Sequence, residues 1–138
     1  MEAFDWRAYL HHSFVVVRLQ SQGELEDQAR ARSAMSRGYY ALHNVAREYA
    51  VLFMSFKQEE NYDKAHSQLV RLMDKAGGPE ERVVSRLLDE TRAWRNAADY
   101  DAEPFGKSLS EVEVVLVRIK KAIGSIDTLR KRREAVKR

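Results

Sequence analysis

Residues 91–101 read Thr91-Arg92-Ala93-Trp94-Arg95-Asn96-Ala97-Ala98-Asp99-Tyr100-Asp101, and they end a helix whose pattern indicates how the chain packs. Apolar residues precede and enter this stretch at spacings of three and four, which places them on one helix face. At about 100° per residue, Arg95 lies within roughly 60° of that face. An unpaired buried charge is costly, so Arg95 needs a partner. Asp99 is the expected one, because side chains four residues apart meet on a helix. The apolar face of this helix is formed by Val83, Val84, Leu87, Leu88, Thr91, Trp94 and Ala98.

A second run, Ser36-Arg37-Gly38-Tyr39-Tyr40-Ala41, lies upstream. Together with residues 95–101 and with the opening Asp5-Trp6 and Tyr9-Leu10, it resembles the small prokaryotic stand-alone branch of the HEPN superfamily (higher eukaryotes and prokaryotes nucleotide-binding domain). The resemblance covers about residues 5–126. It implies an all-α, HEPN-like helical bundle of about five helices with an antiparallel four-helix core, and a homodimer.

Length and composition independently favour one helical domain. The chain has 138 residues, 44% of them hydrophobic, with only two prolines and six glycines to interrupt helices. We assign residues 1–128 to a single HEPN-like helical domain and residues 129–138 to a basic C-terminal tail. This tail has six Lys or Arg and one Glu, whereas the whole chain carries only +3, so the body is not a basic nucleic-acid-binding surface. The tail is expected to be a fraying helical extension or disordered, and either solvated or docked on RNA or a partner.

Several classes of protein are disfavoured. There is no cysteine, which excludes disulfides and thiol chemistry. The apolar runs are too short to span a bilayer, and Met1–Asp5 lacks the basic start of a signal peptide, so we expect a cytoplasmic protein without membrane contacts. No cofactor is expected. No metal is expected either, because His11 and His12 diverge by about 100° on a helix.

The periodicity predicts five helices. The first spans about residues 5–20, with Asp5 as N-cap and Gly23 at its end, and the second runs from 24 or 26 to 53 or 56. A polar connector over 57–63 precedes a third helix over 64–75, where His66 is expected to cap or face solvent. The fourth starts at Pro79 and closes at Glu103-Pro104, and Ser108 or Ser110 caps the fifth.

The second helix has two different sides. Its apolar side takes Met35, Tyr39, Leu42, Ala46, Tyr49, Leu52 and Phe53, and Gly38 on that side permits close approach of another helix. Its polar side is either solvated or lines a cleft, where arginine and tyrosine would contact a nucleotide. That side holds Ser36, Arg37, Tyr40, His43, Asn44 and Arg47.

The resemblance also implies a function. Catalytic relatives are metal-independent endoribonucleases with a histidine four to six residues after the arginine, a position where this chain has Tyr100. Tyrosine has an ordinary pKa near 10 and is a poor base at neutral pH. We therefore expect a nucleotide- or RNA-binding protein, part of a toxin–antitoxin or defence-type system and paired with a nucleotidyltransferase or antitoxin. The binding residues would be Ser36, Arg37, Tyr40, Arg95, Asn96 and Asp99.

Two alternatives stay open. One is an endoribonuclease toxin in which Arg95 acts with Tyr100 or with His43. In an unbroken helix Tyr100 points about 140° away from Arg95, so the two cooperate only if the helix ends near Ala98 or if two subunits meet there. The other alternative is a non-catalytic helical scaffold that dimerises.

Overall fold

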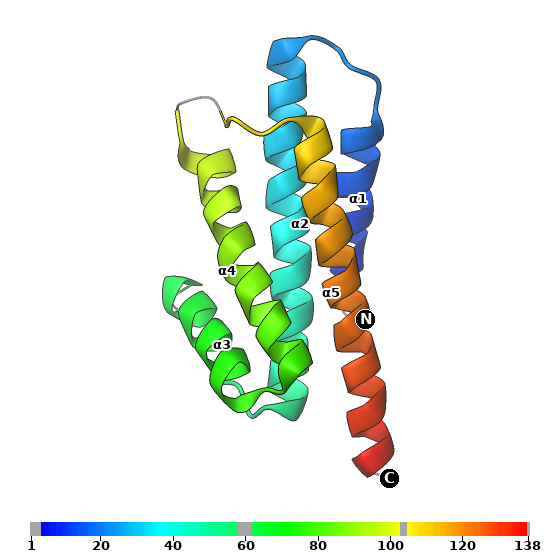
Figure 1. Ribbon diagram of the computed structural model, residues 1–138, viewed down its shortest axis with the longest axis vertical. Coiled ribbons are helices and arrows are strands. Elements are labelled where there is room, and N and C mark those ends of the chain that lie inside the picture. Colours follow the sequence, from blue (N-terminus) through cyan, green and yellow to red (C-terminus); the bar gives the residue numbers. More distant parts are fainter. Residues whose placement is uncertain (1–3, 58–61, 103–104, 138) are drawn as a thin grey trace.

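The computed structural model describes residues 4–57, 62–102 and 105–137, which form five α-helices and no strand (Figure 1). None of these helices combines the length and the apolar content needed to cross a lipid bilayer. The helices are α1 (Arg7–Arg18), α2 (Glu24–Phe53), α3 (Tyr62–Ala76), α4 (Pro79–Tyr100) and α5 (Leu109–Lys137).

Helix α2 is the centre of the bundle. Helices α1, α4 and α5 all pack against it, and α3 lies outside, mainly on α4. In Figure 1 the chain runs up α1, down α2, up α4 and down α5, so α2 is antiparallel to α1 and α4 and parallel to α5. The expected all-α helical bundle is confirmed, while the HEPN likeness and the homodimer stay predictions.

The apolar side of α2 is mostly as predicted. Met35, Tyr39 and Tyr49 are fully buried, and so are Leu42 and Ala46. The predicted place of Leu52 in the core is wrong, because this residue is 51% exposed and faces an open groove beside the end of α5.

Gly38 lies where α2 packs closely against α5. A Cβ atom at this position would lie 2.4 Å from Leu116 Cδ2 and 3.5 Å from Ile119 Cδ1. Leu116 and Ile119 are both fully buried, so their side chains cannot move aside freely. The predicted close approach of another helix at Gly38 is therefore confirmed.

The helix ends follow local sequence signals with one exception. Pro79 begins α4 as predicted, and Ser108 caps α5: its Oγ accepts from Glu111 N–H at 3.1 Å. The prediction that Gly23 ends the first helix is wrong. Helix α1 ends at Arg18, and Gly23, with φ of 100°, instead precedes α2, where its carbonyl accepts the Asp27 N–H.

Two other predicted boundaries need comment. Helix α1 begins at Arg7 rather than at Asp5, but Asp5 Oδ1 accepts the Arg7 N–H at 3.0 Å and so satisfies a donor of the first turn. Helix α4 ends at Tyr100, and the proposed breaking pair at 103–104 lies outside the described residues, as does most of the connector over 57–63.

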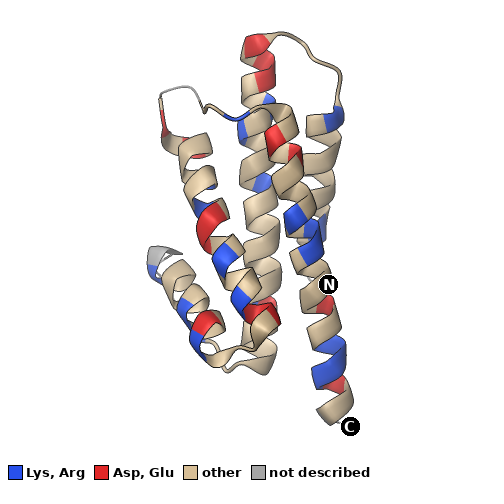
Figure 2. Cartoon of the chain, viewed as in Figure 1, with Lys and Arg blue, Asp and Glu red and all other residues tan. Residues whose placement is uncertain are grey.

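The basic C-terminal segment continues α5 as far as Lys137. Arg133 Nε donates to the Tyr49 hydroxyl at 2.6 Å, and Arg133 Nη2 lies 3.5 Å from the buried Glu81 carboxylate. Arg132 pairs with Glu80 on α4. The segment is thus a helical extension, the first of the two expected alternatives, and Figure 2 shows its Lys and Arg residues along the lower part of α5.

Candidate functional site

Arg95 points from α4 toward the tyrosines of α2, and only 6% of the residue is exposed. Its guanidinium carbon lies 5.1 Å from the ring centre of Tyr39 and 5.4 Å from that of Tyr40. Nη1 also donates to the Tyr40 hydroxyl at 3.4 Å. A cation–π contact contributes about 0.5–2 kcal/mol, whereas removing a charge from water costs several kcal/mol. The rings therefore hold the cation in place without neutralising it.

The predicted ion pair between Arg95 and Asp99 is not formed, so that prediction is wrong. Asp99 is exposed, and its Oδ2 accepts a hydrogen bond from Ser36 Oγ at 3.0 Å. Among the described residues, no carboxylate forms a salt bridge with Arg95 and no acceptor bonds its Nε. The guanidinium lies instead over the rings of buried Tyr39 and half-buried Tyr40, where cation–π attraction offsets part of its lost hydration.

Tyr100 lies closer to Arg95 than the sequence predicted. Helix α4 is continuous through Tyr100, yet the guanidinium carbon is 5.8 Å from the Tyr100 ring centre. The long arginine side chain spans the angle that separates the two positions on the helix. Neither an early helix end at Ala98 nor a second subunit is needed to bring them together, which corrects that expectation. Tyr100 itself is 74% exposed, whereas Arg95 is 6% exposed.

An open pocket of about 390 Å³ lies beside this arginine, between α2 and the end of α4. Tyr40 connects the two, because it lines the pocket and accepts the hydrogen bond from Arg95. Arg37 at the same pocket is exposed, and its guanidinium stacks on Tyr9 of α1 at 4.8 Å. The pocket is lined by Ser33, Ser36, Arg37, Tyr40 and Asp99.

The structure thus brings together most of the predicted binding residues. Ser36, Arg37, Tyr40 and Asp99 share the pocket, and Arg95 lies behind Tyr40. Asn96 is separate from them: it is exposed on α4 and is not one of the described residues that line the pocket.

His43 is buried beneath this site, which contradicts the predicted polar side of α2. His43 and Asn44 are only 3% and 4% exposed, because α3 and α4 cover this part of the helix. The His43 ring stacks on His66 of α3, with ring centres 5.9 Å apart and planes 10° from parallel. The Tyr39 hydroxyl shares a 2.5 Å hydrogen bond with His66 Nδ1.

Both histidines are held neutral by their surroundings. Burial lowers the pKa of His43 to about 3, helped by His66 and by the charges of three arginines, including Arg95 and Arg92. Burial and the same Arg92 lower the pKa of His66 to about 4, although Asp89 lies 3.5 Å from its Nε2 and acts in the opposite direction. The region therefore has arginine charge but no additional charge from histidine at neutral pH.

Two residues of this region, His66 and Ser33, are not among the predicted site residues. The predicted surface or capping role of His66 is wrong, since the residue is 2% exposed. Its position three residues before Leu69 and seven before Met73 places it on the buried face of α3, a signal that was present in the sequence. Ser33 was also missed, although it lies on one helix face with Ser36, Arg37 and Tyr40.

Among the described residues no three His, Asp or Glu side chains gather as metal ligands would. Comparisons with protein-family models, with curated proteins and with solved structures find no match.

Proposed function

We propose that this protein binds a nucleotide or RNA through a phosphate group held at the α2–α4 pocket, with Arg95 as the central cation. The HEPN resemblance supports the proposal at the level of motifs. In this proposal the protein is a component of a toxin–antitoxin or defence-type system and works beside a nucleotidyltransferase in the cytoplasm.

The proposal is based on the surroundings of the buried Arg95. Arg95 is 6% exposed, is surrounded by tyrosine rings rather than carboxylates, and retains an Nε without a hydrogen-bond partner among the described residues. A buried cation of this kind gains most from an anion that can enter its surroundings. Phosphate suits this role because its oxygens accept several hydrogen bonds from a planar guanidinium.

The pocket residues fit the remaining parts of a nucleotide. Tyr40 and Tyr100 offer aromatic rings on which a base can stack. The Ser36 and Tyr40 hydroxyls offer hydrogen bonds, and Arg37 adds a second charge at the pocket rim. Asp99 accepts hydrogen bonds, which suits a ribose hydroxyl better than a phosphate.

Binding is favoured over cleavage by the character of the possible bases. His43 is 3% exposed and its pKa is lowered to about 3, so it is a weak base and remote from solvent. Tyr100 is the only exposed group of the predicted catalytic set next to Arg95. Its distance of 5.8 Å from the guanidinium to the ring centre is the observation that keeps an endoribonuclease with Arg95 and Tyr100 as a second candidate.

A helical scaffold that only dimerises is the third candidate. If this candidate is correct, substitutions at Arg95 should leave the dimerisation of the protein unchanged. A homodimer itself remains part of the proposal, although Arg95 and Tyr100 already meet within one chain. Light scattering coupled to size-exclusion chromatography measures the mass of the assembly directly.

The test compares Arg95→Met with Arg71→Met, a matched removal of an exposed arginine on α3. Fluorescence anisotropy with labelled single-stranded RNA and with a labelled nucleotide measures affinity, and electrophoresis of the same RNA in EDTA measures cleavage. We expect at least tenfold weaker binding for Arg95→Met, unchanged binding for Arg71→Met, and no cleavage. Equal binding by both variants would refute the proposal. Cleavage that disappears in Tyr100→Phe would favour the endoribonuclease.

A further inference from the structure

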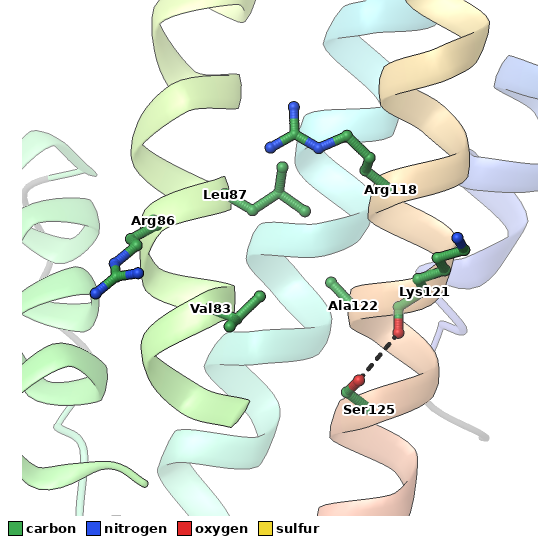
Figure 3. A pocket seen from close by; sticks show the side chains of 7 residues that line it. All are labelled: Val83, Arg86, Leu87, Arg118, Lys121, Ala122 and Ser125. Atoms are coloured by element: carbon green, nitrogen blue, oxygen red, sulfur yellow. Dashed lines mark hydrogen bonds between the residues drawn. The ribbon is translucent and has the colours of Figure 1, made fainter. Parts of the chain in front are cut away.

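A groove between α4 and α5 lies on a different face from the pocket described above. On α4, Arg86 and Asp99 point about 140° apart, so the groove and the nucleotide pocket are on different sides of this helix. The groove has a volume of about 350 Å³. Figure 3 shows the seven side chains that line it: Val83, Arg86, Leu87, Arg118, Lys121, Ala122 and Ser125.

The floor of the groove is apolar. Leu87 from α4 and Ala122 from α5 form it, and both are largely buried. Val83 adds an apolar wall and is 59% exposed. An apolar strip between two helices is a surface that a third helix can cover.

The edges of the groove are cationic on both sides. In Figure 3, Arg86 extends outward on the α4 side and Lys121 on the α5 side, with the apolar residues between them. Arg118 is already occupied, since it makes two hydrogen bonds to the Glu90 carboxylate at 2.9 and 2.8 Å. In the described part of the chain neither Arg86 nor Lys121 forms an ion pair.

We infer that this groove docks an acidic amphipathic helix of a partner protein. The helix would place a narrow apolar stripe on Val83, Leu87 and Ala122. Carboxylates on its two flanks would meet Arg86 on one side and Lys121 on the other, where opposite charges fix its position.

Other occupants fit the groove less well. A second copy related by a two-fold axis would bring the same cations against each other, and like charges across an interface are unfavourable. Single-stranded RNA is recognised through stacking on aromatic rings, and no aromatic residue is among the described residues that line the groove.

The test uses a synthetic 18-residue peptide with leucines at helical spacing and glutamates on both flanks, labelled with fluorescein. A peptide with lysine in place of every glutamate is its counterpart. Anisotropy titration with the full chain is expected to give a Kd of roughly 10–100 μM for the acidic peptide and no measurable binding for the basic one. The double variant Arg86→Glu/Lys121→Glu should bind at least tenfold more weakly.

A matched control is Arg71→Glu/Lys75→Glu, which makes the same charge change at exposed positions of α3 and should alter affinity less than twofold. Val83→Asp tests the apolar wall of the groove without changing its cations, and it should also weaken binding of the acidic peptide. Circular dichroism of each variant checks the fold. Equal affinity for both peptides, or equal loss in the groove and control variants, would overturn the inference. The inference would also be overturned if the double variant Arg86→Glu/Lys121→Glu dissociated a dimer of the protein or abolished its binding of RNA.

Discussion

The buried histidine pair predicts that the protein loses stability at mildly acidic pH. His43 and His66 are 3% and 2% exposed, and their pKa values in the folded protein are lowered to about 3 and about 4 from 6.5. A lowered histidine pKa means that the unfolded chain binds the proton more tightly. The stabilising contribution is therefore complete above pH 6.5 and is lost as the pH falls from 6.5 toward the folded pKa.

The size of the effect at pH 5 depends little on the folded pKa values, because both lie below 5. Each histidine then binds about one proton in the unfolded chain and almost none in the folded one. The free energy of unfolding falls by about 1.4 kcal/mol per histidine for each pH unit below 6.5, which gives roughly 2 kcal/mol each and about 4 kcal/mol for the pair at pH 5. Carboxylates with lowered pKa values, such as Glu81, reduce stability only as the pH falls below about 5.

Urea unfolding at pH 8, 7, 6 and 5, followed by circular dichroism, measures the slope of the free energy of unfolding against pH. The matched control is His11→Gln/His12→Gln, which removes two exposed histidines and should leave the slope unchanged. The variant His66→Gln should reduce it by about half. A free energy of unfolding that stays constant between pH 7 and pH 5 in the wild type would refute the reasoning.

Three further predictions concern the bundle itself. Gly38→Ala is expected to lower the free energy of unfolding, measured with urea, by about 1–2 kcal/mol. The added Cβ would lie 2.4 Å from buried Leu116 Cδ2, and this overpacking outweighs the gain in helix propensity. A more stable variant would contradict this prediction. Arg133→Ala removes the hydrogen bond to Tyr49 on α2 and the ion pair with Glu81 on α4, so it should lower the thermal midpoint and reduce the free energy of unfolding by about 1–3 kcal/mol. The control Lys131→Ala should change the free energy of unfolding by less than about 0.5 kcal/mol. Equal effects of the two variants would show that the C-terminal extension is not anchored. Ser108→Ala removes the cap of α5 and should reduce stability by about 1 kcal/mol in chemical unfolding, and Ser108→Asp should restore most of it.

The sequence predicts the helices well because their signals are local. Apolar residues at spacings of three and four specify the buried faces, and residues such as Pro79 and Ser108 specify where helices start. The close approach at Gly38 also follows from its place on the apolar side of α2. The buried place of His66 was within reach of the same reasoning, but its residue type suggested a surface position.

The site itself could be predicted only in part. The pocket combines Ser36 and Tyr40 from α2 with Asp99 from the end of α4, and motif resemblance suggested these members. The direction of Arg95 could not be predicted, because local sequence offers Asp99 as its partner. Tertiary packing instead presents two tyrosine rings from a helix more than fifty residues away.

Phosphate binding by Arg95 can be tested by NMR, which follows the Arg95 Nε–H resonance in a ¹⁵N-labelled protein during titration with a nucleoside monophosphate and, separately, with inorganic phosphate. Arg95→Lys identifies the resonance by its disappearance. If Arg95 binds phosphate, this resonance shifts saturably with both ligands, and the resonance of the exposed Arg71 shifts much less. An Arg95 resonance that stays unmoved while the protein remains folded would contradict the assignment of Arg95 as the phosphate-binding cation.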